Sequence, residues 1–104
     1  MTDQPGSSME IQHKQKGTKG LFYIDLEGKI LAEMVYTMAG NDKMIIEHTE
    51  VDDELRGKNI GAQLVKHAVE YARQNKLKII PVCPFANAVF KKKPEYHDVL
   101  FSSK

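Results

Sequence analysis

The sequence has little of what secreted and membrane proteins usually depend on. Its 104 residues include no tryptophan and one cysteine, so no disulfide forms within a single chain. We therefore expect a fold that does not need oxidation, and a cytoplasmic location. No hydrophobic run approaches the ~20 residues that a membrane-spanning helix needs. The sequence predicts no membrane partner.

An excess of charge of one sign is also missing. Fifteen basic residues are balanced by fourteen acidic ones, for a net charge of +1. This balance gives no electrostatic reason to expect binding to nucleic acid or to a membrane surface. The four histidines and the cysteine have none of the short spacings of metal-binding motifs, so we expect no metal site.

The residues that are present suit one small domain. Hydrophobic residues make up 41% of the chain, enough for a single core. The first eight residues are polar and contain proline, glycine and two serines. We expect residues 1–8 to form a disordered tail and residues 9–104 to form the domain.

The first half of the domain has the pattern of an antiparallel meander. Runs rich in β-branched and aromatic residues are separated by short turns that contain glycine. The Glu27-Gly28 turn in particular predicts a β-hairpin. The expected strands are residues 10–16, Leu21–Leu26, Lys29–Thr37 and Met44–Val51.

The second half changes to helical periodicity. Small and apolar residues recur every three or four positions from Gly61 to Ala72, which predicts a helix that ends near Asn75. Three further elements are expected: a strand at Leu77–Val82, a short helix between Pro84 and Pro94, and a last small strand at Tyr96–Phe101.

The order strand, helix, strand after Met44 implies a right-handed crossover with parallel pairing. Together with the meander it predicts an α/β fold with a mixed sheet. Pro81 lacks the N–H group that a central strand needs, so we expect the pairing of its strand to fail there.

The loop from Arg56 to Gly61 is a candidate anion site. It has two glycines and two cations, and it lies directly before a helix, where free N–H groups and the helix dipole favour negative charge. Such a loop can hold a pyrophosphate. The alternative is an ordinary turn with solvated cations, because one glycine motif is weak support.

The strand before this loop carries a candidate acid–base pair. With period two, one face carries Met44, Ile46, His48 and Glu50, and the other carries Ile45, Glu47, Thr49 and Val51. His48 and Glu50 could then handle a proton together, since imidazole titrates near neutrality. The alternative is a hydrogen-bonded histidine beside a surface carboxylate.

Cys83 follows the second parallel strand, where α/β proteins often bind ligands. Its thiol is a candidate nucleophile, although buried inert cysteines are more frequent. The Lys91-Lys92-Lys93 run fits a solvated helix end.

A family resemblance rests on these segments. The run Val51–Leu64 resembles motif A of the GCN5-related N-acetyltransferases, with Arg56 and Gly61 at the first and last motif positions. Asn59 stands where the family has its middle glycine, and asparagine is the residue that best tolerates left-handed backbone after glycine. The segment Asn87–Tyr96 is similar to the helix that follows the fifth strand in that family.

Other short segments look like a compact subfamily of about this length. They are HTEV at His48–Val51, the single Cys83, and Pro94-Glu95-Tyr96. The resemblance covers about Leu21 to Tyr96.

The resemblance implies binding of acetyl-CoA and transfer of its acetyl group to an amine. It implies that amides of the loop hold the pyrophosphate, that the backbone near Thr49–Val51 pairs with the pantetheine arm, and that the parallel strands splay apart near Pro81. The implied cofactor-binding residues are Thr49, Glu50, Val51, Arg56, Gly57, Lys58, Asn59, Ile60, Gly61, Asn87 and Phe90, and the candidate catalytic residues are Cys83, His48 and Glu50.

Two departures from the family pattern leave alternatives open. The helical segment that larger relatives use to bind the acceptor has no counterpart, and Phe90 stands where a tyrosine often acts as general acid. The chain could instead be a non-catalytic acyl-CoA binder or sensor, or an interaction module that docks through a Phe85/Phe90 helix face. The sequence predicts neither the acceptor nor the oligomeric state.

Overall fold

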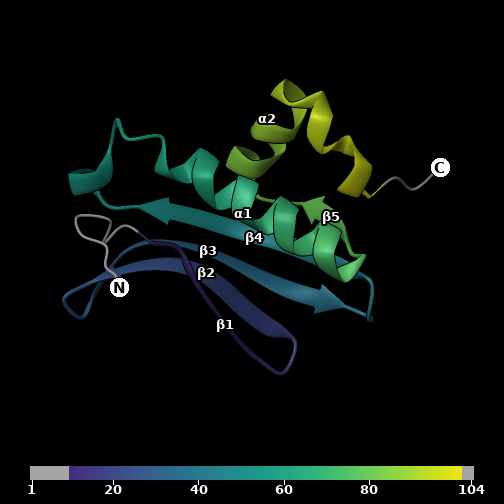
Figure 1. Ribbon diagram of the computed structural model, residues 1–104, viewed down its shortest axis with the longest axis horizontal. Helices are drawn as coiled ribbons and strands as arrows, with labels where there is room; N and C mark the ends of the chain where they lie inside the picture. The colour runs from purple at the N-terminus through teal and green to yellow at the C-terminus, as the bar shows by residue number, and fades with distance from the viewer. Residues whose placement is uncertain (1–9, 102–104) are drawn as a thin grey trace.

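The computed structural model describes residues 10–101, so the expected tail at residues 1–8 lies outside the described residues (Figure 1). The strands are β1 (Gln12–Lys16), β2 (Lys19–Leu26), β3 (Lys29–Ala39), β4 (Lys43–Val51) and β5 (Lys78–Pro81). The helices are α1 (Ile60–Asn75) and α2 (Pro84–Lys92), with 3₁₀ turns η1 (Asp53–Leu55) and η2 (Pro94–Val99). None of the helices in this described range is long and apolar enough to cross a membrane.

The strands form one mixed sheet in the order β1-β2-β3-β4-β5. The pairs from β1 to β4 are antiparallel, and β4 pairs with β5 in parallel. Helices α1 and α2 both lie over the same face of this sheet (Figure 1). The predicted α/β fold with an antiparallel meander and a parallel crossover is therefore confirmed.

The helical periodicity of α1 supplies one side of the core. Its buried side chains are Ile60, Leu64, Val65, Ala68, Val69 and Ala72, as the spacing predicts. They pack against buried side chains of β2, β3 and β4 such as Phe22, Met34 and Ile46. Burial of this face is the main force that holds α1 on the sheet.

A β-bulge in β4 overturns the predicted division of its faces. Tyr36 is paired with Ile46 and Val35 with His48, so one residue of β4, Glu47, has no partner of its own on β3. Such an extra residue shifts the alternation of side chains by one position. His48 and Glu50 therefore point away from the helices, and the prediction that they share a face with Met44 and Ile46 is wrong.

The parallel pairing of β4 and β5 stops early. It runs from Lys43 with Lys78 to Ile46 with Pro81, and the backbone N–H of Cys83 then donates to the Ile46 carbonyl over 3.0 Å. In the described part of the chain no strand pairs with β4 beyond Ile46 on this side. The prediction that pairing fails at Pro81 is confirmed, and the two strands diverge from this point.

The expected strand at Tyr96–Phe101 is wrong. Residues Pro94–Val99 form 3₁₀ turns, and only Leu100 makes an isolated bridge, to Ile79. The side chain of Arg73 fixes this segment against α1 by donating to both carboxylate oxygens of Asp98, over 2.8 and 2.9 Å. These tertiary contacts override the strand preference of the local residues.

Candidate functional site

The loop before α1 presents backbone donors, of which the N–H group of Lys58 already donates to the Leu55 carbonyl over 3.3 Å. Gly57 and Asn59 both have left-handed backbone, with φ of 80° and 62°. The start of α1 has no side-chain cap and no acidic residue in its first turn. The first N–H groups of a helix lack intrahelical partners, and the helix dipole adds partial positive charge there. An anion is the ligand that suits these groups.

Two cations lie in the same loop. The Arg56 Nε atom is 2.7 Å from Asp53 Oδ1, but both side chains are largely exposed, so this ion pair is weak and easily exchanged for another. Lys58 is exposed as well. The loop therefore combines backbone donors with exposed positive charge.

A cavity of about 430 Å³ runs from this loop to the unpaired end of β4. All residues of the Arg56–Gly61 loop except Lys58 line it, together with Thr49, Val51, Leu55, Ala62 and Phe85. We call it the loop cavity. Because of the bulge, Thr49 and Val51 are the residues of this part of β4 that face the helices.

Gly61 is required by packing at this cavity. A Cβ atom at this position would lie 2.6 Å from Cζ and 2.8 Å from Cε2 of Phe85. Glycine therefore lets the Phe85 ring of α2 approach the first turn of α1. Sequence reasoning did not include Phe85 among the cofactor residues, and the small residue at Gly61 was the only local sign of a close neighbour.

Cys83 lies beside the loop cavity, directly before α2. It is 4% exposed, and its Sγ atom is 3.6 Å from Thr49 Oγ1. Burial raises the pKa of the thiol, but hydrogen bonds from the backbone N–H groups of Ala86 and Phe85 and from Thr49 outweigh it, so the net pKa lies below its usual range. The thiol is thus more acidic than an ordinary cysteine.

A second group of titratable side chains lies on the opposite face of the sheet. His48 Nε2 is 3.7 Å from Glu33 Oε2, and Glu33 and Glu50 are paired across β3 and β4. One ligand atom from each of the three residues lies within 4.8 Å of the others, a grouping that can hold a cation. The spacing of histidines along the chain gave no sign of this group, because Glu33 comes from a neighbouring strand.

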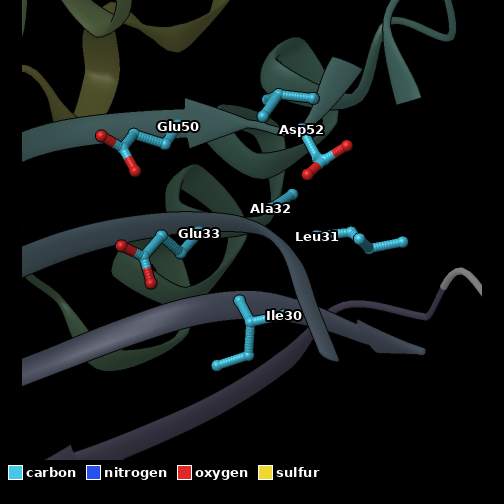
Figure 2. A pocket seen from close by; sticks show the side chains of 7 residues that line it. Ile30, Leu31, Ala32, Glu33, Glu50 and Asp52 are labelled. Atoms are coloured by element: carbon cyan, nitrogen blue, oxygen red, sulfur yellow. The ribbon is translucent and has the colours of Figure 1, made fainter. Parts of the chain in front are cut away.

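Two of the three residues, Glu33 and Glu50, line a cavity of about 500 Å³ that we call the acidic cavity; His48 lies outside its lining. Figure 2 shows the carboxylates of Glu33 and Glu50 on neighbouring strands, pointing to the same side. Asp52, Ile30 and Leu31 also line this cavity. The cavity therefore offers three carboxylates to a ligand.

The structure divides the candidate catalytic residues between two faces. Cys83 contacts Thr49 on the helix side, whereas His48 and Glu50 are exposed on the other side. All of them lie near the part of β4 that pairs with β3 but has no strand neighbour on the β5 side. The three residues do not form one contact cluster.

The two residues expected from α2 are placed differently from each other. Asn87 is half-buried, and its Nδ2 donates to the Pro81 carbonyl over 3.4 Å, which links α2 to the end of β5. Phe90 is 2% exposed and packs edge-on against Tyr96, with ring centroids 6.0 Å apart. A docking surface made of Phe85 and Phe90 therefore does not form, because Phe90 is in the core.

In this structure, the parallel strands of a mixed sheet diverge beside an uncapped helix start. This arrangement is that of the class of acetyltransferase folds that the sequence resembles. The family model described as GCN5-related N-acetyl-transferase matches residues 21–99. The chain belongs to this family, and the predicted resemblance is confirmed.

Known proteins extend this result. The chain is similar to a GCN5-like protein of Staphylococcus aureus solved by NMR, with 43% identity, a TM-score of 0.71, and coverage of 94% of this chain and 93% of that one. It is 30% identical over 91 residues to Protein NATD1 of Xenopus tropicalis, covering 86% of this chain and 82% of the relative. A GNAT family acetyltransferase of Elizabethkingia anophelis with acetyl-CoA bound shares the fold, at 16% identity and a TM-score of 0.57 over 74% of this chain and 53% of that one.

Proposed function

We propose that this protein binds acetyl-CoA and transfers the acetyl group to an amine. The observation that carries the proposal is the continuity of the loop cavity, which joins the uncapped start of α1 to Thr49 beside Cys83. One cavity thus combines an anion site with an apolar path to a thiol. This is the arrangement that a cofactor with a pyrophosphate and a long thioester arm requires.

The cofactor would lie along this cavity in two parts. The N–H groups from Gly57 to Gly61, apart from that of Lys58, would donate to the pyrophosphate, with the side chains of Arg56 and Lys58 adding positive charge. The pantetheine arm would follow the unpaired edge of β4 at Thr49–Val51, where backbone groups are free to pair with its amides. The relative from Elizabethkingia anophelis, which shares the fold, has acetyl-CoA bound.

The acidic cavity would take the amine. In the reaction, the neutral amine nitrogen attacks the thioester carbonyl carbon, so the C–N bond forms and the C–S bond breaks. CoA leaves as a thiolate, and the proton that the nitrogen loses after the attack passes to this thiolate. The amine arrives protonated at neutral pH, so a base must remove one proton. Glu50 would accept it, with His48 and Glu33 as its neighbours across the two strands.

Cys83 would act at the acetyl end of the cofactor. Its acidic thiol either accepts the acetyl group and passes it to the amine, or donates the proton that the leaving thiolate needs. The first path leaves a thioester on Cys83 when the amine is omitted, and mass spectrometry detects the added acetyl group. The second path leaves no adduct, but Cys83→Ala still lowers the rate.

A non-catalytic acyl-CoA binder is the second candidate. It is favoured by Phe90, which has no hydroxyl to donate and is buried in the core. Release of CoA thiol from acetyl-CoA, followed with a panel of primary amines, separates the two candidates. Amine-dependent release that falls in Cys83→Ala and Glu50→Gln supports the transferase. Binding of acetyl-CoA with no release above the rate without protein supports the binder.

A further inference from the structure

The backbone of Cys83 is fixed on both sides. Its N–H group donates to the Ile46 carbonyl of β4 over 3.0 Å, and its carbonyl accepts from the Asn87 N–H group of α2 over 2.9 Å. Cys83 therefore joins the last position of β4 that pairs with β5 to the start of α2. With the backbone held, rotation about χ1 is the main freedom left to the sulfur.

The Thr49 hydroxyl contacts this sulfur from β4. Thr49 Oγ1 and Cys83 Sγ are 3.6 Å apart. Thr49 also lines the loop cavity, so the contact lies at the wall of that cavity. Within residues 10–101, Cys83 is the only side chain that hydrogen-bonds to this hydroxyl. The hydroxyl is thus available to the sulfur without competition from another side chain.

A hydroxyl can serve both protonation states of the sulfur. It accepts from the S–H group of a thiol, and after rotation about its C–O bond it donates to a thiolate. The bond to the thiolate is the stronger of the two, because charge-assisted hydrogen bonds are roughly twice as strong as neutral ones. Thr49 therefore favours the thiolate and holds the sulfur in one place.

The remaining groups that set the pKa of this thiol belong to the backbone. Burial raises the pKa, and the N–H groups of Ala86 and Phe85 in the first turn of α2 lower it, together with the backbone of Thr49. No charged side chain among the described residues is part of this set. The Thr49 hydroxyl is the one side-chain donor in the set, so a substitution can remove it and leave the backbone donors in place.

We propose that Thr49 is a positioning residue for acetyl transfer, whose hydroxyl holds the Cys83 sulfur at the loop cavity and donates to it once the thiol proton has left. This inference rests on the proposed function, in which Cys83 acts at the acetyl end of the cofactor. The hydroxyl makes no bond to the acetyl group and acts through the sulfur alone.

Both proposed paths of Cys83 pass through its thiolate. If Cys83 is the nucleophile, its thiolate attacks the thioester carbonyl carbon, an S–C bond to Cys83 forms, and the C–S bond to CoA breaks. The thiol proton passes to the leaving CoA thiolate, and the proton that the amine loses in the next step restores the thiol. If Cys83 is the acid, its S–H group gives the proton to the CoA thiolate, and the amine proton again restores the thiol. Thr49 stabilises the thiolate in either path.

The first test follows the protonation of Cys83 without acetyl-CoA. Because the chain has one cysteine, isotope labelling at cysteine Cβ gives a single NMR signal that reports thiol and thiolate during a pH titration. Thr49→Val keeps the shape of the side chain and removes the hydroxyl. Its titration should shift to higher pH, with a thiolate fraction about tenfold lower at pH values below the midpoint. Thr49→Ser keeps the hydroxyl and should titrate close to wild type.

The control for the threonine-to-valine change is Thr18→Val. Thr18 is exposed in the turn between β1 and β2, so this variant should titrate like wild type. The second test measures amine-dependent release of CoA thiol at saturating acetyl-CoA, where the rate does not depend on affinity. Below the midpoint, Thr49→Val should release CoA about tenfold more slowly than wild type, and Thr49→Ser should recover most of the rate.

Each result has a distinct meaning. A Thr49→Val titration that matches wild type would overturn the positioning role, because the hydroxyl would then not interact with the sulfur. A shifted titration with an unchanged rate of release would also overturn it, since the contact would then have no effect on transfer. If wild type releases no CoA with any amine, the proposed function fails and the positioning role fails with it. The titration needs no acetyl-CoA, so it distinguishes a missing contact from a missing activity.

Discussion

Asn59 offers a direct test of how the loop before α1 is built. Its backbone is left-handed, with φ of 62° and ψ of 28°, and its side chain makes no capping hydrogen bond to the helix. Asparagine is therefore present for its backbone tolerance and not for a contact of its side chain. Asn59→Ala and Asn59→Gly separate these two roles, because both remove the amide and only alanine opposes the left-handed geometry.

The magnitude follows from the backbone conformation. Left-handed geometry costs an ordinary L-residue about 1–2 kcal/mol, and asparagine less. Asn59→Ala should thus lower the free energy of unfolding by about 1 kcal/mol, which corresponds to about 4–8 °C in Tm for a domain of this size. Asn59→Gly relieves the strain but adds freedom to the unfolded chain, so it should stay within about 0.5 kcal/mol of wild type.

Urea unfolding followed by circular dichroism measures these differences. Lys58→Ala is the control, because Lys58 is exposed in the same loop and is not among the left-handed residues. Asn59→Gly should also retain affinity for CoA, since glycine keeps the amides in place. Equal stability of the alanine and glycine variants would refute the claim that the left-handed backbone dictates this residue.

Three further predictions follow from single contacts. Gly61→Ala should push the Phe85 ring out of the loop cavity and weaken CoA binding severalfold. The protein should lose little stability, because the ring is at the surface. Unchanged affinity for CoA would mean that the ring does not touch the ligand. Phe90→Ala should reduce the unfolding free energy by about 3–5 kcal/mol, as for other buried aromatics, and a loss below about 1 kcal/mol would place Phe90 outside the core. Burial, and then the nearby charge of His67, lower the pKa of His13 below its ordinary 6.5. The unfolded chain then binds more protons, so stability should fall as pH drops from about 6.5 toward the folded-state pKa, with a shallower slope in His13→Gln.

The sequence was informative where local patterns decide the structure. The spacing of small and apolar residues predicted α1 to within one residue at its start, because the helix buries one continuous stripe. The missing N–H of Pro81 predicted where the parallel pairing ends. The left-handed position at Asn59 was also predictable, since few residues tolerate it.

The remaining features depend on contacts between distant segments. The bulge at Glu47 is a property of the pairing of β4 with β3, and period two in one strand cannot reveal it. It moves His48 and Glu50 to the face that carries Glu33. The turns at Pro94–Val99 likewise depend on Arg73, which is far away in the chain.

Titration of acetyl-CoA into the isotope-labelled protein, followed by amide NMR, tests the central claim most directly. We expect chemical shift changes concentrated at Thr49–Gly61 and around Cys83, because these amides line or adjoin the loop cavity. Desulfo-CoA should move the loop amides in the same way. The proposed binding of acetyl-CoA would be contradicted if neither ligand, at millimolar concentration, changes the chemical shifts of the loop amides and of the Cys83 amide.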